Sequence, residues 1–254
     1  MRFIGVDLSW RCRPFKEGAT AICRCDERGE FDDPVLLTSD EDIISYIGGA
    51  DAWVGIDAPL LVPNELGIRS GEREILKEGM RVLPTNKRFL RDHCGGARGE
   101  PLSHMLEEKA FRRGRPGPLP TRAYFETYPF SLISSLFPGG IRYKRGKAAE
   151  KRNACQDILG RLQGWDPGIQ IPPALCDEVG HAAPSQMKAV GDKVDALLCA
   201  ACVYAHWLYG GQRTRLVGDE KDGYILIVRR DGPQGNDRSA APRGVQKGGV
   251  DRRF

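Results

Sequence analysis

Residues 2–8 read Arg-Phe-Ile-Gly-Val-Asp-Leu, a short apolar run that carries an aspartate, Asp7, near its end. An apolar run of this length, followed by turn residues, is typical of a buried strand. Residues 19–25 alternate like the second arm of a hairpin, and residues 52–56 form another apolar run. Asp57-Ala58-Pro59 ends that second run, because proline stops regular strand pairing. The start of the chain therefore predicts a sheet with acids at its strand ends.

Helical patterns occupy most of the remaining chain. We expect helices over residues 40–47, 147–162 and 186–209, and further helices near 70–79 and 101–112. Strands are expected over residues 124–128 and 223–229, and the proline- and glycine-rich residues 164–184 indicate a linker. Together these patterns predict an α/β fold, a mixed sheet flanked by helices.

The predicted elements also define the domain organisation. A single domain is expected over residues 1–230, with a helical insertion at residues 60–121, after the strand that Asp57 ends. Residues 231–254 contain Gly, Pro, Arg and little apolar material, and we expect a disordered tail there.

Five acids in this pattern are candidates for chemistry. Asp7, Asp57 and Glu126 lie at or next to the ends of predicted strands, and Asp192 and Asp195 are three residues apart on the predicted helix 186–209. Strand ends at one edge of an open sheet share a crevice, and helix positions three apart are neighbours. Ordinary structural roles compete with this interpretation, because Asp57 can shape a turn and Asp192 can cap a helix.

Clustered carboxylates repel one another unless they are protonated or share a cation. Hard oxygen ligands favour Mg²⁺ or Mn²⁺, and two such ions about 4 Å apart can activate water and stabilise a leaving oxygen in phosphoryl displacement. The acids therefore predict a two-metal site held by Asp7, Asp57, Asp192 and Asp195. For Glu126, a metal-binding role and a substrate-binding role both stay open.

The charge is distributed unevenly along the 254 residues. The formal net charge is only +4, but residues 109–152 hold eleven Lys or Arg against two Glu, a local charge of +9, which leaves −5 for the rest. Such a concentration favours a phosphate-bearing partner, nucleic acid. The candidate substrate-binding residues are Arg122, Lys144, Arg145 and Lys147, and neighbouring aromatic residues such as Tyr124, Phe125, Tyr128 and Tyr143 can stack on bases. A solvated loop with ordinary core aromatics is the alternative.

Several protein classes are excluded by composition. The longest apolar run, residues 196–208, is too short to cross a bilayer. No secretory signal precedes Phe3-Ile4-Gly5-Val6, so we expect a cytoplasmic protein without membrane contact. Its eight cysteines are then expected to be free thiols, with Cys199 and Cys202 one helical turn apart in the core.

The order of four motifs resembles that of domain-of-unknown-function family 429, described as predicted nucleases with a ribonuclease-H-like fold. The motifs are Ile4-Gly5-Val6-Asp7, Gly55-Ile56-Asp57-Ala58-Pro59-Leu60, Glu126-Thr127-Tyr128-Pro129 and Asp192-Lys193-Val194-Asp195-Ala196-Leu197. Two shorter pieces, Glu72-Arg73-Glu74 and Asp222-Gly223-Tyr224-Ile225, support the resemblance, which covers roughly residues 2–229. It implies that Asp7 bridges the metal ions, that Asp57 is the fourth-strand acid and that the Asp192/Asp195 pair is similar to that of junction resolvases.

The leading hypothesis is therefore a metal-dependent nuclease. Two other functions stay open. A non-catalytic nucleic-acid-binding module would bind without cleaving, and a phosphotransferase of the actin and sugar-kinase superfamily would bind ATP. The second alternative usually needs two similar domains and glycine-rich phosphate loops, which Asp7-Leu8-Ser9 does not supply.

Overall fold

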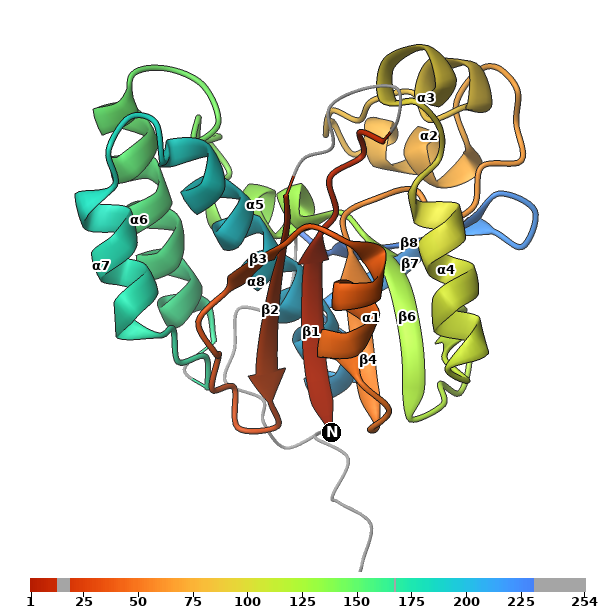
Figure 1. Ribbon diagram of the computed structural model, residues 1–254, viewed down its shortest axis with the longest axis horizontal. Coiled ribbons are helices and arrows are strands. Elements are labelled where there is room, and N and C mark those ends of the chain that lie inside the picture. The colour runs from red at the N-terminus through yellow and green to blue at the C-terminus, as the bar shows by residue number, and fades with distance from the viewer. Residues whose placement is uncertain (13–18, 167, 231–254) are drawn as a thin grey trace, which may run out of the picture.

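The computed structural model describes residues 1–12, 19–166 and 168–230, so the expected tail at 231–254 lies outside the described residues. The described chain forms one mixed sheet with helices on both of its faces (Figure 1). This confirms the expected α/β class and is compatible with a ribonuclease-H-like fold. In these ranges no helix is long and apolar enough to span a membrane.

The sheet has eight strands in the order β3-β2-β1-β4-β6-β8-β7, with β5 paired to β6 beside this path. The strands are β1 (Arg2–Asp7), β2 (Thr20–Asp26), β3 (Val35–Leu37), β4 (Ala52–Ile56), β5 (Arg112–Arg113), β6 (Arg122–Thr127), β7 (Thr214–Asp219) and β8 (Gly223–Val228). Parallel pairs join β1 to β4, β4 to β6 and β6 to β8, whereas β1–β2, β2–β3 and β7–β8 are antiparallel. The carboxyl ends of β1, β4 and β6 therefore lie at the same edge.

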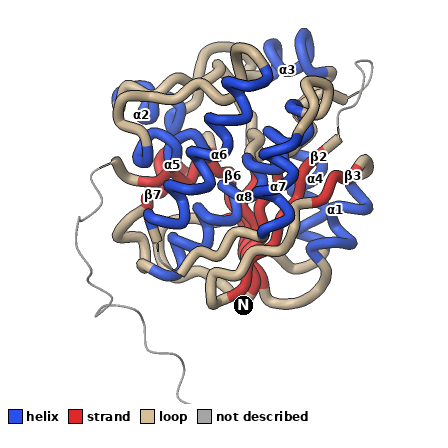
Figure 2. The backbone as a smooth tube through the Cα atoms, turned by 90° about the vertical axis from the view of Figure 1, so that its left-hand side faces the viewer, coloured by secondary structure: helices blue, strands red, loops and turns tan. Residues whose placement is uncertain are grey.

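Two helical layers cover the sheet. The helices are α1 (Asp40–Ile47), α2 (Ser70–Lys77), α3 (Lys87–Cys94), α4 (Gly99–Glu108), α5 (Pro129–Leu136), α6 (Ala148–Trp165), α7 (Pro173–His181) and α8 (Met187–Leu208). Helices α5 to α8 share one apolar cluster with Phe3, Trp53 and Phe125, and Figure 2 shows α6, α7 and α8 together in front of the strands. Helices α1 and α4 share another cluster with Ile4 and Val54. Alternation along each strand separates these clusters, because successive side chains point to opposite faces.

Helix α8 packs directly on two strand glycines. A Cβ added at Gly5 would lie 2.0 Å from the carbonyl oxygen of Ala196, and one at Gly55 would lie 2.8 Å from that of Cys199. Only a residue without a side chain permits this approach. Cys199 and Cys202 are fully buried in the same helix, which confirms their core role, and all eight cysteines are free.

Some elements differ from the sequence expectations. The expected linker at 164–184 is wrong, because α7 lies within it. Pro172 and Pro173 stand at the N-cap and first position of α7, where proline suits a helix start. Pro129 likewise begins α5 directly after β6, and the strands β3, β5 and β7 and the helix α3 were also not predicted.

Candidate active site

Asp7 and Asp57 lie side by side at the carboxyl edge of the sheet. The register pairs Val6 with Ile56, and the Asp57 N–H donates to the carbonyl oxygen of Val6 over 2.8 Å. Asp7 has the strand parity of Gly5, and Asp57 that of Gly55, so both belong to the face that α8 covers. The two carboxylates line a cavity of about 320 Å³.

Asp195 completes this group from α8. It precedes Ala196, whose carbonyl oxygen meets Gly5, so the glycine contact brings Asp195 toward the end of β1. Its side chain has no exposed surface. The Tyr143 hydroxyl donates to Asp195 Oδ1 over 2.8 Å, and the Lys144 ammonium forms an ion pair with Asp195 Oδ2. We call Asp7, Asp57 and Asp195 the aspartate cluster.

The negative charge of the aspartate cluster is not fully balanced by neighbouring positive charge. Burial, with repulsion from Asp195 and Asp57, raises the pKa of Asp7 well above its ordinary value. Burial and Asp195 raise the pKa of Asp57 to about 7, although Lys144 opposes the shift. Burial also raises the pKa of Asp195, against the lowering effects of Lys144 and Tyr143. A buried carboxylate group of this kind is a common mark of a functional site.

Asp192 lies at the rim of the cluster rather than inside it. It is one turn before Asp195 on α8, its side chain is 18% exposed, and it contacts Lys188 Nζ over 2.5 Å. Its charge is felt by Asp7 and Asp195, whose pKa values it helps to raise. Asp192 sits inside α8, which begins at Met187, so the capping alternative does not apply.

Glu126 lines the same cavity but belongs to a different network. It pairs in the sheet with Ile56 and has the parity of Tyr124, so it lies on the opposite face from Asp57. Arg69 donates to both of its oxygens, over 2.8 Å to Oε2 and 2.5 Å to Oε1, and the Leu60 N–H donates to Oε2 over 3.0 Å. Both oxygens of Glu126 are thereby occupied.

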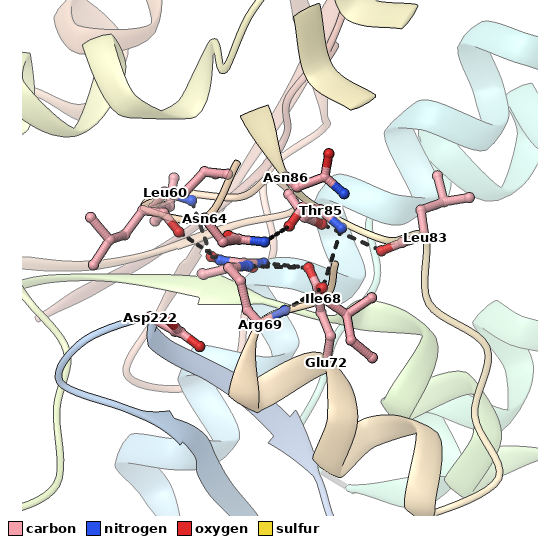
Figure 3. A network of polar contacts seen from close by, with 12 residues as sticks. Leu60, Asn64, Ile68, Arg69, Glu72, Leu83, Thr85, Asn86 and Asp222 are labelled. Atoms are coloured by element: carbon pink, nitrogen blue, oxygen red, sulfur yellow. Dashed lines mark hydrogen bonds and ion pairs between the residues drawn. The ribbon is translucent and has the colours of Figure 1, made fainter. Parts of the chain in front are cut away.

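Arg69 and Glu72 form the rest of this network, which is shown in Figure 3. Glu72 accepts from the Arg69 side chain and from the backbone N–H groups of Arg69 and Thr85, and both side chains are only 2% exposed. We call Arg69, Glu72 and Glu126 the arginine cluster. It fixes α2 and the segment after β4 to the sheet.

Sequence reasoning did not single out Arg69. A signal was present, since an Arg directly before a predicted helix, three residues ahead of Glu72, has the spacing of a helix-start contact. The shorter motif pieces also tie α2 to the β7–β8 hairpin. Glu74 accepts from the Gly218 N–H over 3.0 Å, and Asp222 accepts from the Ser70 N–H over 2.8 Å.

A family model covers most of this architecture. The model described as "Protein of unknown function (DUF429)" matches residues 5–222, a span that includes both clusters. The chain belongs to the DUF429 family. No curated protein and no solved structure matches it.

The donor chemistry of this DUF429 protein suits a hard divalent cation, because three carboxylates, those of the half-buried Asp7 and Asp57 and of the buried Asp195, converge with excess negative charge. The distances between these carboxylates do not yet form a metal-ligand set. In the part of the chain that the structure describes, no group of three or more His, Cys, Asp or Glu side chains is arranged to hold a metal ion. The Lys144 ammonium lies among the carboxylates instead.

The predicted substrate-binding residues lie in two separate regions, the segment before α6 and the start of β6. Lys144 is in the site, and Arg145 and Lys147 follow it on the same exposed segment before α6. Arg122 lies at the opposite end of β6 from Glu126, where its guanidinium donates to the Gly49 and Lys109 carbonyl oxygens. The structure therefore does not bring Arg122 to the aspartate cluster.

Other cations of the basic segment lie in β5 and just after it. Arg112, Arg113 and Arg115 line a second cavity of about 790 Å³, together with Leu61 and Tyr224. Leu61 follows the Leu60 backbone that Glu126 binds, so the two cavities adjoin the same segment of chain.

The aromatic residues of the basic segment are mostly structural. Tyr124 and Phe125 are buried core residues on opposite faces of β6, so the core alternative holds for them. Tyr143 is also buried and holds Asp195. Of the four aromatic residues predicted to stack on bases, Tyr128 is the one that lines the cavity beside Asp7 and Asp57.

Proposed function

We propose that this DUF429 protein is a divalent-metal-dependent nuclease that hydrolyses phosphodiester bonds in nucleic acid. The observation that carries the proposal is the aspartate cluster, in which strand register and the close packing of α8 bring the half-buried Asp7 and Asp57, which line one cavity, together with the fully buried Asp195. Such a cluster is costly to fold unless it serves a cation.

Mg²⁺ or Mn²⁺ ions are the cofactors that we infer, and Asp7, Asp57 and Asp195 are the residues that would hold them, with Asp192 at the rim. When bound, a pair of such ions would supply an activated water and charge stabilisation for the leaving oxygen. Glu126 would act as a positioning residue, because its oxygens are taken by Arg69 and the Leu60 N–H.

Nucleic acid is the proposed substrate because of charge. The +9 segment 109–152 contributes Lys144 to the site and lines the neighbouring cavity with three arginines. Phosphate-bearing polymers are attracted to such concentrations of cations, and the attraction weakens with salt. The eight free thiols are typical of a reducing compartment and support a cytoplasmic place of action.

The test is cleavage of single-stranded and duplex DNA and RNA with Mg²⁺, Mn²⁺ or a chelator. We expect metal-dependent cleavage that Asp7→Asn and Asp195→Asn each reduce by at least about a hundredfold. Asp51→Asn is the matched control, because Asp51 is exposed and lies at the opposite end of β4 from Asp57.

Two outcomes would contradict the proposal. Full cleavage by the folded Asp7→Asn variant would remove the aspartate cluster from the reaction. Salt-sensitive binding without cleavage at any concentration of either metal ion would instead identify the protein as a nucleic-acid-binding module.

A further inference from the structure

Among the residues that the structure describes, Lys144 is the charged residue that forms an ion pair with Asp195 from outside α8. It belongs to the segment between α5 and α6, where residues 137–147 form no helix or strand. The Lys144 side chain is 54% exposed, whereas Asp195 has no exposed surface. The lysine side chain therefore extends from the surface into the cavity. Because this side chain is not part of the apolar core, it can move away from Asp195 without disrupting core packing.

Both oxygens of Asp195 are in contact with this segment. Lys144 Nζ forms the ion pair with Oδ2, and the Tyr143 hydroxyl donates to Oδ1 over 2.8 Å. An ammonium only donates hydrogen bonds, so it binds the lone pairs of a carboxylate oxygen. A metal ion would need the same lone pairs. A divalent cation and an ammonium would also repel each other strongly across a few ångströms in a partly buried site.

The neighbouring carboxylates hold the Lys144 ammonium in its charged form. Asp7 and Asp57 lie on the same face of the sheet as α8, and Lys144 lines the cavity with them. The attraction of Asp195 and Asp7 outweighs the effect of burial and raises the pKa of Lys144. Arg69 lines this cavity as well, but its guanidinium is committed to Glu72 and Glu126.

We propose that Lys144 is the resident cation of the aspartate cluster, and that a divalent metal ion binds only when the Lys144 ammonium leaves Asp195. This inference rests on the proposed function, since it assumes that the aspartate cluster binds a metal ion. It accounts for carboxylates of suitable chemistry that are not spaced as a ready ligand set. Lys144 released from Asp195 stays at the mouth of the site, where an ammonium can bind phosphate.

The test is calorimetric titration of the full chain with Mn²⁺ alone. Lys144→Ala and Lys144→Gln should each bind Mn²⁺ roughly tenfold to a hundredfold more tightly than the wild-type protein, since they remove the competing charge. Lys144→Arg, which keeps the charge, should stay close to wild type. Arg142→Ala is the matched control, because it removes an exposed cation from the same segment and should change the affinity less than about twofold.

A second readout uses the unmodified protein and needs no variant to fold. The acylation rate of Lys144, followed by mass spectrometry, should increase severalfold when Mn²⁺ is added, because the free amine reacts and the ion-paired one does not. The acylation rate of Lys109, which is exposed and lies beside Arg122 at the opposite end of β6 from the site, provides an internal comparison and should not change.

The outcomes separate the two proposals. Tighter Mn²⁺ binding by both neutral variants, with faster acylation of the wild type, supports the resident cation. Equal or weaker binding by folded Lys144→Ala and Lys144→Gln, with binding lost in Asp7→Asn, overturns the resident cation and leaves the metal site standing. Absence of Mn²⁺ binding in the wild type and in both neutral variants overturns the metal site and the resident cation together.

Discussion

Two clusters of acids contribute side chains to the same cavity, and they are compensated in opposite ways. In the arginine cluster, one guanidinium and three backbone N–H groups satisfy every carboxylate oxygen of Glu72 and Glu126. In the aspartate cluster, the Lys144 ammonium and the Tyr143 hydroxyl both contact Asp195, and the pKa values of all three carboxyl groups are raised.

This difference separates scaffold from chemistry. A fully satisfied buried network rigidifies the fold, and breaking it is costly. An undercompensated cluster makes the folded state less stable and is retained where a function requires it. We therefore expect substitutions in the two clusters to change stability in opposite directions.

The largest expected effect is on the arginine cluster. Arg69→Ala would leave Glu72 and Glu126 buried without their cation, and the free energy of unfolding should fall by about 3–5 kcal/mol. Urea unfolding followed by circular dichroism measures this change. Arg73→Ala is the matched control in α2, whose N-cap is Arg69. Arg73 is exposed, its ion pair with Asp222 is long at 4.0 Å, and its other contact is an exposed hydrogen bond to the Ile68 carbonyl oxygen, so this variant should cost less than about 1 kcal/mol. Equal midpoints for Arg69→Ala and wild type would remove the scaffold role.

A pair of isosteric substitutions compares the clusters directly. Asp7→Asn should raise the free energy of unfolding by about 1 kcal/mol, because it removes one of several repelling charges. Glu126→Gln should lower it by about 2 kcal/mol, because it weakens charge-assisted hydrogen bonds from Arg69. Urea unfolding without divalent cations gives both values. The same sign for both variants would break the contrast.

Stability should depend on pH through Asp57. Its pKa in the folded protein is about 7, above the unfolded value of about 3.9. The stabilising effect of its proton is therefore complete below about pH 4 and is lost as pH rises through about 7. Relative to wild type, Asp57→Asn should gain about 1–2 kcal/mol of unfolding free energy between about pH 5 and about pH 8. A pH-independent difference between the two proteins, measured without divalent cations, would contradict this assignment.

The smallest expected change concerns the rim. Asp192→Asn should alter the free energy of unfolding by less than about 0.5 kcal/mol, because its partner Lys188 is 80% exposed and such pairs contribute little. A loss as large as that of Arg69→Ala in the same urea titration would place Asp192 within a structural network instead.

The sequence predicted the aspartate cluster better than the arginine cluster. Asp7 and Asp57 each end an apolar strand, which predicts that they meet at one edge of the sheet, and the register of β1 with β4 then places them on one face. The partner of Glu126 was not predictable in this way, because Arg69 lies 57 residues earlier in the chain and meets it only through the tertiary fold.

Local signals decided the other successes and failures. Ser39, directly before the predicted helix 40–47, caps α1, since its side chain accepts from the Asp42 N–H. The segment 164–184 was misinterpreted because Pro172 and Pro173 resemble linker residues, although proline also starts helices. Arg122 was grouped with the site because it is close to Glu126 in sequence. The two residues lie toward opposite ends of β6, a strand of six residues, so Arg122 is remote from the site.

The most direct test of the contrast is a crystal structure of the protein soaked in Mn²⁺, with anomalous scattering used to locate the ions. We predict anomalous density at Asp7, Asp57 and Asp195, with Lys144 displaced and with Arg69 still paired to Glu72 and Glu126. Density at Glu126 and Glu72, or no bound Mn²⁺ with the aspartates unchanged, would contradict the assignment of the aspartate cluster as the cation site.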